Sequence, residues 1–204
     1  MSREYTSALD QAAHWPVHFN KAQTIYDEGE LSEAMYRVQT GCVRLQVNGA
    51  DGSRQIVRFV FPGEVFGLCM ERRNTAAEAV TNVELIRFSL SSVLELCAAN
   101  AAAAIELMDL STQAYRELAH HIERIAHLPA TERVAWFFNL MLKHAIIDAD
   151  CTAPKMLMSH RDIADYLAIT PETLSRSLKI LQQRNVVARQ RPHPMPADQP
   201  GFAA

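Results

Sequence analysis

Two helix-start signals within residues 159–187 constrain this chain more than any other feature of its sequence. Ser159 is a good N-cap, and Asp162 three residues later completes a capping-box pattern. Thr170 is a second N-cap, because its hydroxyl can accept a hydrogen bond from an orphan backbone N–H. Pro171 then suits the first helical position, where no backbone donor is needed. The segment therefore predicts two short helices joined by a tight turn.

The second of these helices has two chemically different faces. Leu174, Leu178 and Leu181 recur at helical spacing and are expected to face inward. The other side is polar and partly basic, with side chains able to reach base edges: Glu172, Thr173, Ser175, Arg176 and Lys179. Arginine bonds guanine in a bidentate manner, and glutamate accepts a hydrogen bond from cytosine. A structural helix pair is the alternative, in which the glutamate complements the helix N-terminus and the basic side chains are simply solvated.

The segment IADYLAITPETLSRSLKIL resembles the DNA-recognition motif of the CRP/FNR superfamily of bacterial transcription regulators. Its ETLSR portion matches the E-x-x-S-R core of the branch that contains the oxygen and nitric-oxide responders. The resemblance implies that Glu172, Ser175 and Arg176 read base edges of a TTGAT-like half-site. Pro171 stands where cyclic-AMP receptors have a further arginine, so their half-site preference is not expected here.

Charge is distributed unevenly along the chain. The formal net charge is −3, which taken alone argues against a nucleic-acid binder. Residues 1–128 carry 11 Lys and Arg against 16 Asp and Glu, whereas residues 154–204 carry 7 against 4. A mildly basic C-terminal segment in a chain whose N-terminal part is acidic is compatible with local docking onto DNA.

Residues 22–88 have the pattern of short strands separated by turns. Val43, Leu45 and Val47 alternate with polar residues, as a half-buried strand should. Further strands are expected over 56–61 and 83–88, and the hairpin connection over 48–52 contains two glycines. Six of the seven glycines of the chain lie between Gly29 and Gly67, and this distribution predicts an antiparallel roll or barrel.

This region resembles the cyclic-nucleotide-binding β-roll of the same superfamily, and residues 63–80 correspond to its phosphate-binding cassette. In cyclic-AMP receptors an acidic residue after the second cassette glycine holds the ribose, and an Arg-Ser pair holds the cyclic phosphate. Here Leu68 follows Gly67, and Arg73-Asn74-Thr75 replaces Arg-Ser. The arginine can bind an anion, but the ribose acid is missing, so cyclic AMP is not expected as the effector.

Residues 101–128 predict one long helix with two apolar stripes. The first stripe consists of Ile105, Met108, Thr112, Tyr115, Ala119, Ile122 and Ala126. The second consists of Leu107, Ser111, Ala114, Leu118, His121, Ile125 and Leu128. Both stripes must be buried, which suggests that one packs on the roll and the other on a second copy of the chain. The resemblance implies the same homodimer, whose two-fold symmetry suits half-sites one helical turn apart.

The expected fold class is α+β, with an N-terminal antiparallel β-roll, a long dimerisation helix and a C-terminal winged helix-turn-helix. The expected domains are a sensor roll over 1–98, the long helix over 99–128, a DNA-binding domain over 129–191 and a disordered tail over 192–204. Leu128-Pro129 is expected to act as a hinge, residues 131–147 as a helix, and residues 148–154 as a linker. Prolines after Val187 predict a shortened wing.

The resemblance also implies an effector in or near the roll and the long helix. The oxygen sensors of the family use an N-terminal cysteine cluster, and this chain has no cysteine before Cys42, so an iron–sulfur cluster of that type is excluded. Heme is a candidate, with His14 and His18 as possible ligands and histidines of the long helix beside them. An unidentified small ligand is the other, in a pocket expected to include Arg73, Asn74, Thr75, Tyr115 and His121.

The sequence thus predicts a homodimeric regulator of transcription that binds double-stranded DNA and contacts RNA polymerase. A ligand receptor that acts through protein partners and an effector-independent regulator are the alternatives. An enzyme is not expected: no histidine lies between His18 and His120 to build a metal site on the roll, and no nucleophile–base pair is recognisable. No signal-peptide pattern or apolar run of about 18 residues appears, so we expect a cytoplasmic protein without a membrane span.

Overall fold

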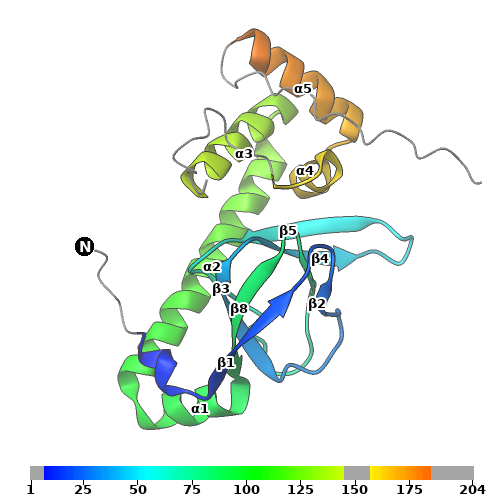
Figure 1. Ribbon diagram of the computed structural model, residues 1–204. Helices are drawn as coiled ribbons and strands as arrows, with labels where there is room; N and C mark the ends of the chain where they lie inside the picture. Colours follow the sequence, from blue (N-terminus) through cyan, green and yellow to red (C-terminus); the bar gives the residue numbers. More distant parts are fainter. Residues whose placement is uncertain (1–6, 145–156, 185–204) are drawn as a thin grey trace, which may run out of the picture.

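The computed structural model describes residues 7–144 and 157–184, which form a β-roll, a long helix and a module of three helices in that order (Figure 1). The fold is α+β, as predicted. The linker over 148–154, the wing after Val187 and the tail over 192–204 were all predicted for segments that lie outside the described residues.

The roll consists of two antiparallel four-stranded sheets. Their strand orders are β1-β8-β3-β6 and β2-β7-β4-β5. The strands are β1 (His14–Phe19), β2 (Thr24–Tyr26), β3 (Ala34–Thr40), β4 (Val43–Asn48), β5 (Arg54–Val60), β6 (Val65–Phe66), β7 (Ala76–Ala79) and β8 (Val83–Ser89). Val38, Val43 and Leu85 are fully buried between the sheets. The predicted hairpin joins β4 to β5, with Asn48 paired to Arg54 across the turn.

Two helices follow the roll, and the sequence predicted only the second. Helix α1 (Leu90–Ala99) lies at the end of the roll far from the helical module, close to the 3₁₀ helix η1 (Ala8–Gln11). Helix α2 (Ala101–His127) agrees with the predicted long helix. Asn100 separates α1 from α2 and accepts a hydrogen bond from the backbone N–H of Ala102, so it caps the second helix. Helix α2 runs along the roll and carries the chain to the helical module (Figure 1).

The helical module consists of α3 (Ala130–His144), α4 (His160–Leu167) and α5 (Pro171–Gln183). Both predicted helix starts are confirmed: Ser159 and Asp162 form the capping box of α4, and the Thr170 hydroxyl caps α5. Ala168 adopts a left-handed conformation in the turn, with φ of 51°. Buried apolar side chains from the three helices share one core with Ile56 and Phe59 of the roll. The helical members include Val134, Phe137, Ile163, Leu167, Leu174 and Leu181.

Arg133 connects the end of α2 to the end of α4. Its Nε donates a hydrogen bond to the carbonyl oxygen of Leu128 at 2.8 Å, and its Nη1 donates to that of Leu167 at 3.0 Å. A cation at this place satisfies carbonyl groups that have no partner within their own helices. The segment around Leu128, where the sequence predicts a hinge, is therefore held by a side chain of α3.

Candidate DNA-reading helix and internal cavity

The outward face of α5 carries the side chains that the sequence assigned to DNA reading. Glu172, Ser175, Arg176 and Lys179 are all exposed, whereas Leu174 and Leu181 on the opposite side are buried. Leu178 packs against the same core. The predicted division of this helix into an apolar and a polar face is thus confirmed.

Thr173 is partly buried and links the start of α5 to its outward face. Its backbone N–H donates to the Thr170 hydroxyl at 3.2 Å, and its own hydroxyl accepts from Arg176 Nη2 at 3.3 Å. Glu172 lies in the first turn, where its own backbone N–H, the Thr170 hydroxyl and the charge of Arg176 lower the pKa of the carboxyl group. Glu172 is therefore ionised at neutral pH and presents acceptors only, beside an arginine that presents donors.

A cavity of about 540 Å³ lies where the roll, α2 and the helical module meet. All five residues of the predicted effector pocket line it: Arg73, Asn74, Thr75, Tyr115 and His121. The cavity also reaches Trp136 of α3 and Tyr166 of α4, which the sequence did not place there. Aromatic side chains from β2, β5, β6, α2, α3 and α4 make much of its wall apolar. An occupant of this volume would touch both the roll and the helical module.

Arg73 of the predicted cassette is buried and already engaged. Its Nη1 donates to the carbonyl oxygen of Gly67, its Nη2 donates to that of Ala34 at 2.6 Å, and its guanidinium lies 4.2 Å from the ring centre of Tyr26. Gly67 permits this contact, because a Cβ there would lie 2.8 Å from Arg73 Nη1 and the backbone φ is +77°. Its Nε is buried and has no hydrogen-bond partner among the described residues, so the guanidinium keeps a free donor beside these two carbonyl contacts.

His121 is the other unusual group of the cavity. Its ring stacks on Tyr166 with 4.0 Å between ring centroids and 11° between planes, and its side chain is buried. Neither ring nitrogen has a hydrogen-bond partner among the described residues. Burial, with a contribution from Arg124, lowers the pKa of His121 to about 4, and the nearby Tyr166 backbone only partly opposes this. The ring is therefore neutral at physiological pH.

The two N-terminal histidines lie elsewhere. His14 Nδ1 is 2.9 Å from the carbonyl oxygen of Ala12, and its ring packs on Phe88. His18 is exposed near Glu84. Neither lines the cavity. Within residues 7–144 and 157–184, no three His, Cys, Asp or Glu side chains are grouped as a metal ion requires.

The two predicted stripes of α2 have different surroundings. In the second stripe, Leu107 packs on the core beneath α1 and His121 is buried against the helical module. The first stripe is a ridge that leaves Met108 68%, Tyr115 74% and Ile122 58% exposed. The prediction that one stripe packs on the chain's own roll holds only in part, because Ser111 and Leu118 of the second stripe are exposed and His121 packs on the helical module. The ridge is left as an apolar strip on the surface of this chain.

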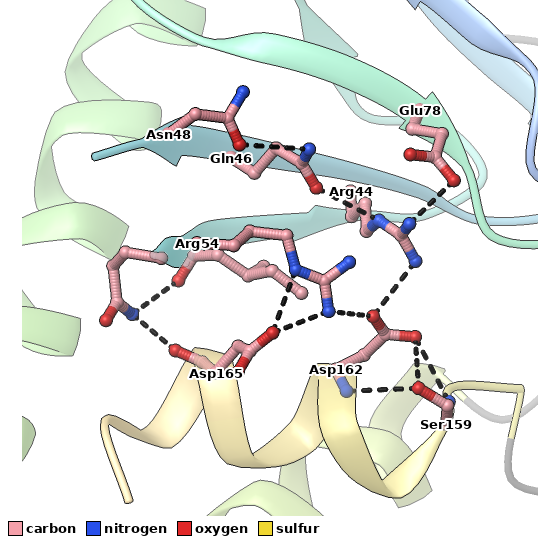
Figure 2. A network of polar contacts seen from close by, with 10 residues as sticks. Arg44, Gln46, Asn48, Arg54, Glu78, Ser159, Asp162 and Asp165 are labelled. Atoms are coloured by element: carbon pink, nitrogen blue, oxygen red, sulfur yellow. Dashed lines mark hydrogen bonds and ion pairs between the residues drawn. The ribbon is translucent and has the colours of Figure 1, made fainter. Parts of the chain in front are cut away.

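A polar network between the roll and α4 was not predicted from the sequence. Figure 2 shows Arg44 of β4 and Arg54 of β5 directed at Asp162 and Asp165 of α4. These pairs are more than a hundred residues apart in the chain, so no local pattern could have revealed them.

For the parts of the chain that the structure describes, none of the helices has the length and apolar character needed to cross a bilayer.

Comparison with known proteins agrees with this architecture. The family model of the cyclic nucleotide-binding domain matches residues 16–100, and that of the Crp-like helix-turn-helix domain matches residues 132–194. The nitrogen fixation regulation protein FixK of Rhizobium meliloti is 32% identical over 171 residues, which are 83% of this chain and 76% of that protein. The cyclic AMP receptor protein of Thermus thermophilus is 27% identical over 173 residues, which are 83% and 77% of the two chains.

Comparison with solved structures also finds a FixK protein. The structure of FixK2 from Bradyrhizobium japonicum aligns with a TM-score of 0.80 and 32% identity, over 85% of this chain and 86% of that one. The similarity extends over both modules and their order along the chain.

Proposed function

The chain belongs to the CRP/FNR family of bacterial transcription regulators, and from this membership we propose that it acts as an effector-controlled homodimer on a pseudo-palindromic, TTGAT-like DNA site. It is a DNA-binding regulator and not an enzyme. The base-reading residues, the dimer, the contact with RNA polymerase and the effector are the proposed part.

The exposed face of α5 is the observation that carries the base-reading proposal. Glu172, Ser175 and Arg176 stand together on a helix that buried leucines anchor, so the side chains project from a fixed support. An ionised glutamate suits the amino group of cytosine, and an arginine suits the acceptor pair of guanine. Thr173 steadies Arg176, and Lys179 one turn further along suits a phosphate.

Replacing Arg176 with alanine tests this role. We expect about 1–3 kcal/mol of lost discrimination between the preferred site and a site altered at one base pair. Competition binding with the two duplexes measures it, at fixed salt. Gln183→Ala is the matched control, because Gln183 is exposed at the far end of the same helix. If Arg176→Ala weakened binding to both duplexes equally, Arg176 would contact phosphate and the base-reading role would be wrong.

The dimer proposal rests on the exposed ridge of α2. Isolated apolar side chains are ordinary on a protein surface, but a continuous ridge along a long helix is typical of a seam between helices. Two copies joined along this ridge would present two α5 helices to one face of a DNA duplex, as a palindromic site requires.

The effector proposal rests on the cavity. Its volume and its mostly apolar wall suit a small organic ligand with a few polar groups. Cyclic AMP does not suit it, because Leu68 stands where the ribose acid would be. For heme, His14 and His18 lie outside the cavity and the ring nitrogens of His121 are enclosed, which leaves the exposed His120 as the histidine of the cavity wall that could ligate iron.

A salt series separates this proposal from a receptor that acts through protein partners. Binding to DNA releases counterions, so the affinity of a DNA-reading dimer falls steeply as salt rises. A module without DNA contacts would show no such dependence. Repeating the series with compounds that raise the melting temperature tests effector control, since an effector-independent regulator would bind DNA equally with and without them.

A further inference from the structure

We propose that Arg44 and Arg54 of the roll are positioning residues for DNA reading, because they hold α4, and through it the recognition helix α5, in the orientation that binds DNA. This inference rests on the proposed function. It adds two roll residues that do not line the cavity.

Asp162 is the centre of the network (Figure 2). Its Oδ1 accepts from Arg44 Nη1 at 2.9 Å and from Arg54 Nη2 at 2.7 Å. The carboxylate side chain is only 6% exposed, so water screens these pairs weakly. Arg44 is itself held by Glu78 of β7 at 2.6 Å, which fixes the arginine on the sheet. The roll therefore presents a pre-oriented cation to α4.

Arg54 and Gln55 hold the next turn of the same helix. Arg54 Nε and Nη2 donate to Asp165 Oδ2 at 2.8 and 2.5 Å. Gln55 Nε2 donates to the backbone carbonyl oxygen of Asp165 at 2.5 Å. Contacts to two successive turns, made partly through the backbone, fix the direction of the helix axis and not only its distance from the sheet.

The other oxygen of Asp162 belongs to the helix itself. Its Oδ2 accepts from the backbone N–H and the hydroxyl of Ser159, at 3.2 and 2.8 Å, in the capping box of α4. Burial opposes ionisation, but the Ser159 hydrogen bonds and the charges of Arg44 and Arg54 together hold the pKa of Asp162 below its ordinary value. The contact with the roll is thus built into the first turn of the helix.

Orientation, more than adhesion, is what such a network supplies. The cost of removing two charges from water offsets most of the Coulomb attraction of a buried pair. An apolar contact would therefore hold the roll and the helical module together equally strongly. A charged network with fixed geometry instead selects one arrangement. Tyr166 of the same helix stacks on His121 of α2, so α4 is held between the roll on one side and the long helix on the other.

The arrangement that the network selects leaves the recognition face free. The contacts use Asp162 and Asp165 of α4, whereas Glu172, Ser175 and Arg176 of α5 stay exposed. In a dimer joined along α2, the direction of α4 relative to α2 then sets the separation of the two recognition helices.

A charge-swap series in the full-length protein tests the inference. The variants are Arg54→Glu, Asp165→Arg and the double variant, and Arg87→Glu is the control because it makes the same charge change on β8, away from α4. Asp165 is preferred to Asp162, whose loss would also remove the helix cap. We expect affinity for the specific site to fall about tenfold or more in each single variant and to be partly restored in the double variant, in which the swapped pair attracts but the new carboxylate still faces Asp162.

The second readout is half-site spacing, measured with duplexes whose half-sites are moved apart or together by one base pair. Wild type should prefer one spacing, the single variants should lose that preference, and the double variant should regain it in part. A merely structural role would lower the melting temperature without changing the preferred spacing. Arg54→Gln is the milder variant, with the same expected direction, for use if Arg54→Glu does not fold.

Two results would overturn the inference. Single variants that bind like Arg87→Glu, with unchanged spacing preference, would show that the network does not position α5. Single variants that bind more tightly than wild type would show that it restrains the recognition helix instead. A wild-type protein without any preference for a specific site would refute the proposed function itself, and this outcome is visible before any variant is made.

Discussion

The buried imidazole of His121 makes the stability of this protein depend on pH in a calculable way. Burial lowers the pKa of His121 from an ordinary value of 6.5 to about 4 in the folded chain. The unfolded chain therefore takes up a proton near pH 6.5, and the folded chain does so only near pH 4. The stability contributed by the neutral ring is fully present above about pH 6.5 and is lost progressively as the pH falls toward 4.

The size of the effect follows from these two values. Between about pH 7.5 and about pH 5, this one group should remove about 2 kcal/mol from the free energy of unfolding. In His121→Phe that loss should disappear, because phenylalanine has no proton to bind. The variant should also gain stability near neutral pH, since the two unpartnered nitrogens cost about 1–3 kcal/mol and the larger ring still stacks on Tyr166.

Chemical denaturation at both pH values, followed by tryptophan fluorescence at equal protein concentration, measures the difference. Trp136 is a suitable reporter because its ring centroid lies 6.2 Å from that of His121. His120→Gln is the control, because this neighbouring histidine is exposed and should leave the loss unchanged. Equal losses of stability in wild type and His121→Phe would refute the reasoning, since the ring would then be accessible to protons in the folded chain.

Three further predictions concern assembly and folding. Ile122→Glu on the exposed ridge should convert the dimer to a monomer in analytical ultracentrifugation, whereas Gln113→Glu away from the ridge should not. Leu174→Ala should lower the free energy of unfolding by about 2–5 kcal/mol because it opens a cavity in a fully buried site; Ile180→Ala, which is partly exposed on the same helix, should cost much less in the same thermal melts. Thr170→Ala should cost about 1 kcal/mol and Thr170→Ser much less, since serine keeps the capping oxygen; a similar loss in both would mean that the hydroxyl does not cap α5.

The elements that the sequence predicted well are those whose signals are local. Ser159, Asp162, Thr170 and Pro171 determine where α4 and α5 begin, because each capping group acts within one turn of its own helix. The two stripes of α2 are also local, since their period depends only on helix geometry. The face of α5 proposed for DNA reading therefore followed from the sequence.

The elements that were missed depend on neighbours. Strand β7 is Ala-Ala-Glu-Ala, a sequence with little preference for strands, and it is extended because it pairs with β4 and β2. Strand β1 contains Pro16 and is mostly exposed at the edge of its sheet, so it lacks an apolar pattern. Helix α1 was not predicted from the sequence, although Asn100, which ends α1 and caps α2, is a local signal for the boundary between the two helices. The contacts of Arg44 and Arg54 with α4 form only when the complete chain has folded, so neither the β4–β5 sequence nor the α4 sequence predicts them.

The double attachment of Arg133 determines what kind of motion can pass through the segment after α2. Its guanidinium group bonds carbonyl oxygens of both Leu128 and Leu167, so bending at Leu128 either breaks one of these bonds or moves α4 together with α3. A change of backbone direction at Leu128 therefore rotates the three-helix module as one body. Because α2 is about 40 Å long, a small tilt at one end becomes a large displacement at α5. Arg133 thus couples bending at Leu128 to the position of α4, and Arg133→Ala would remove this coupling.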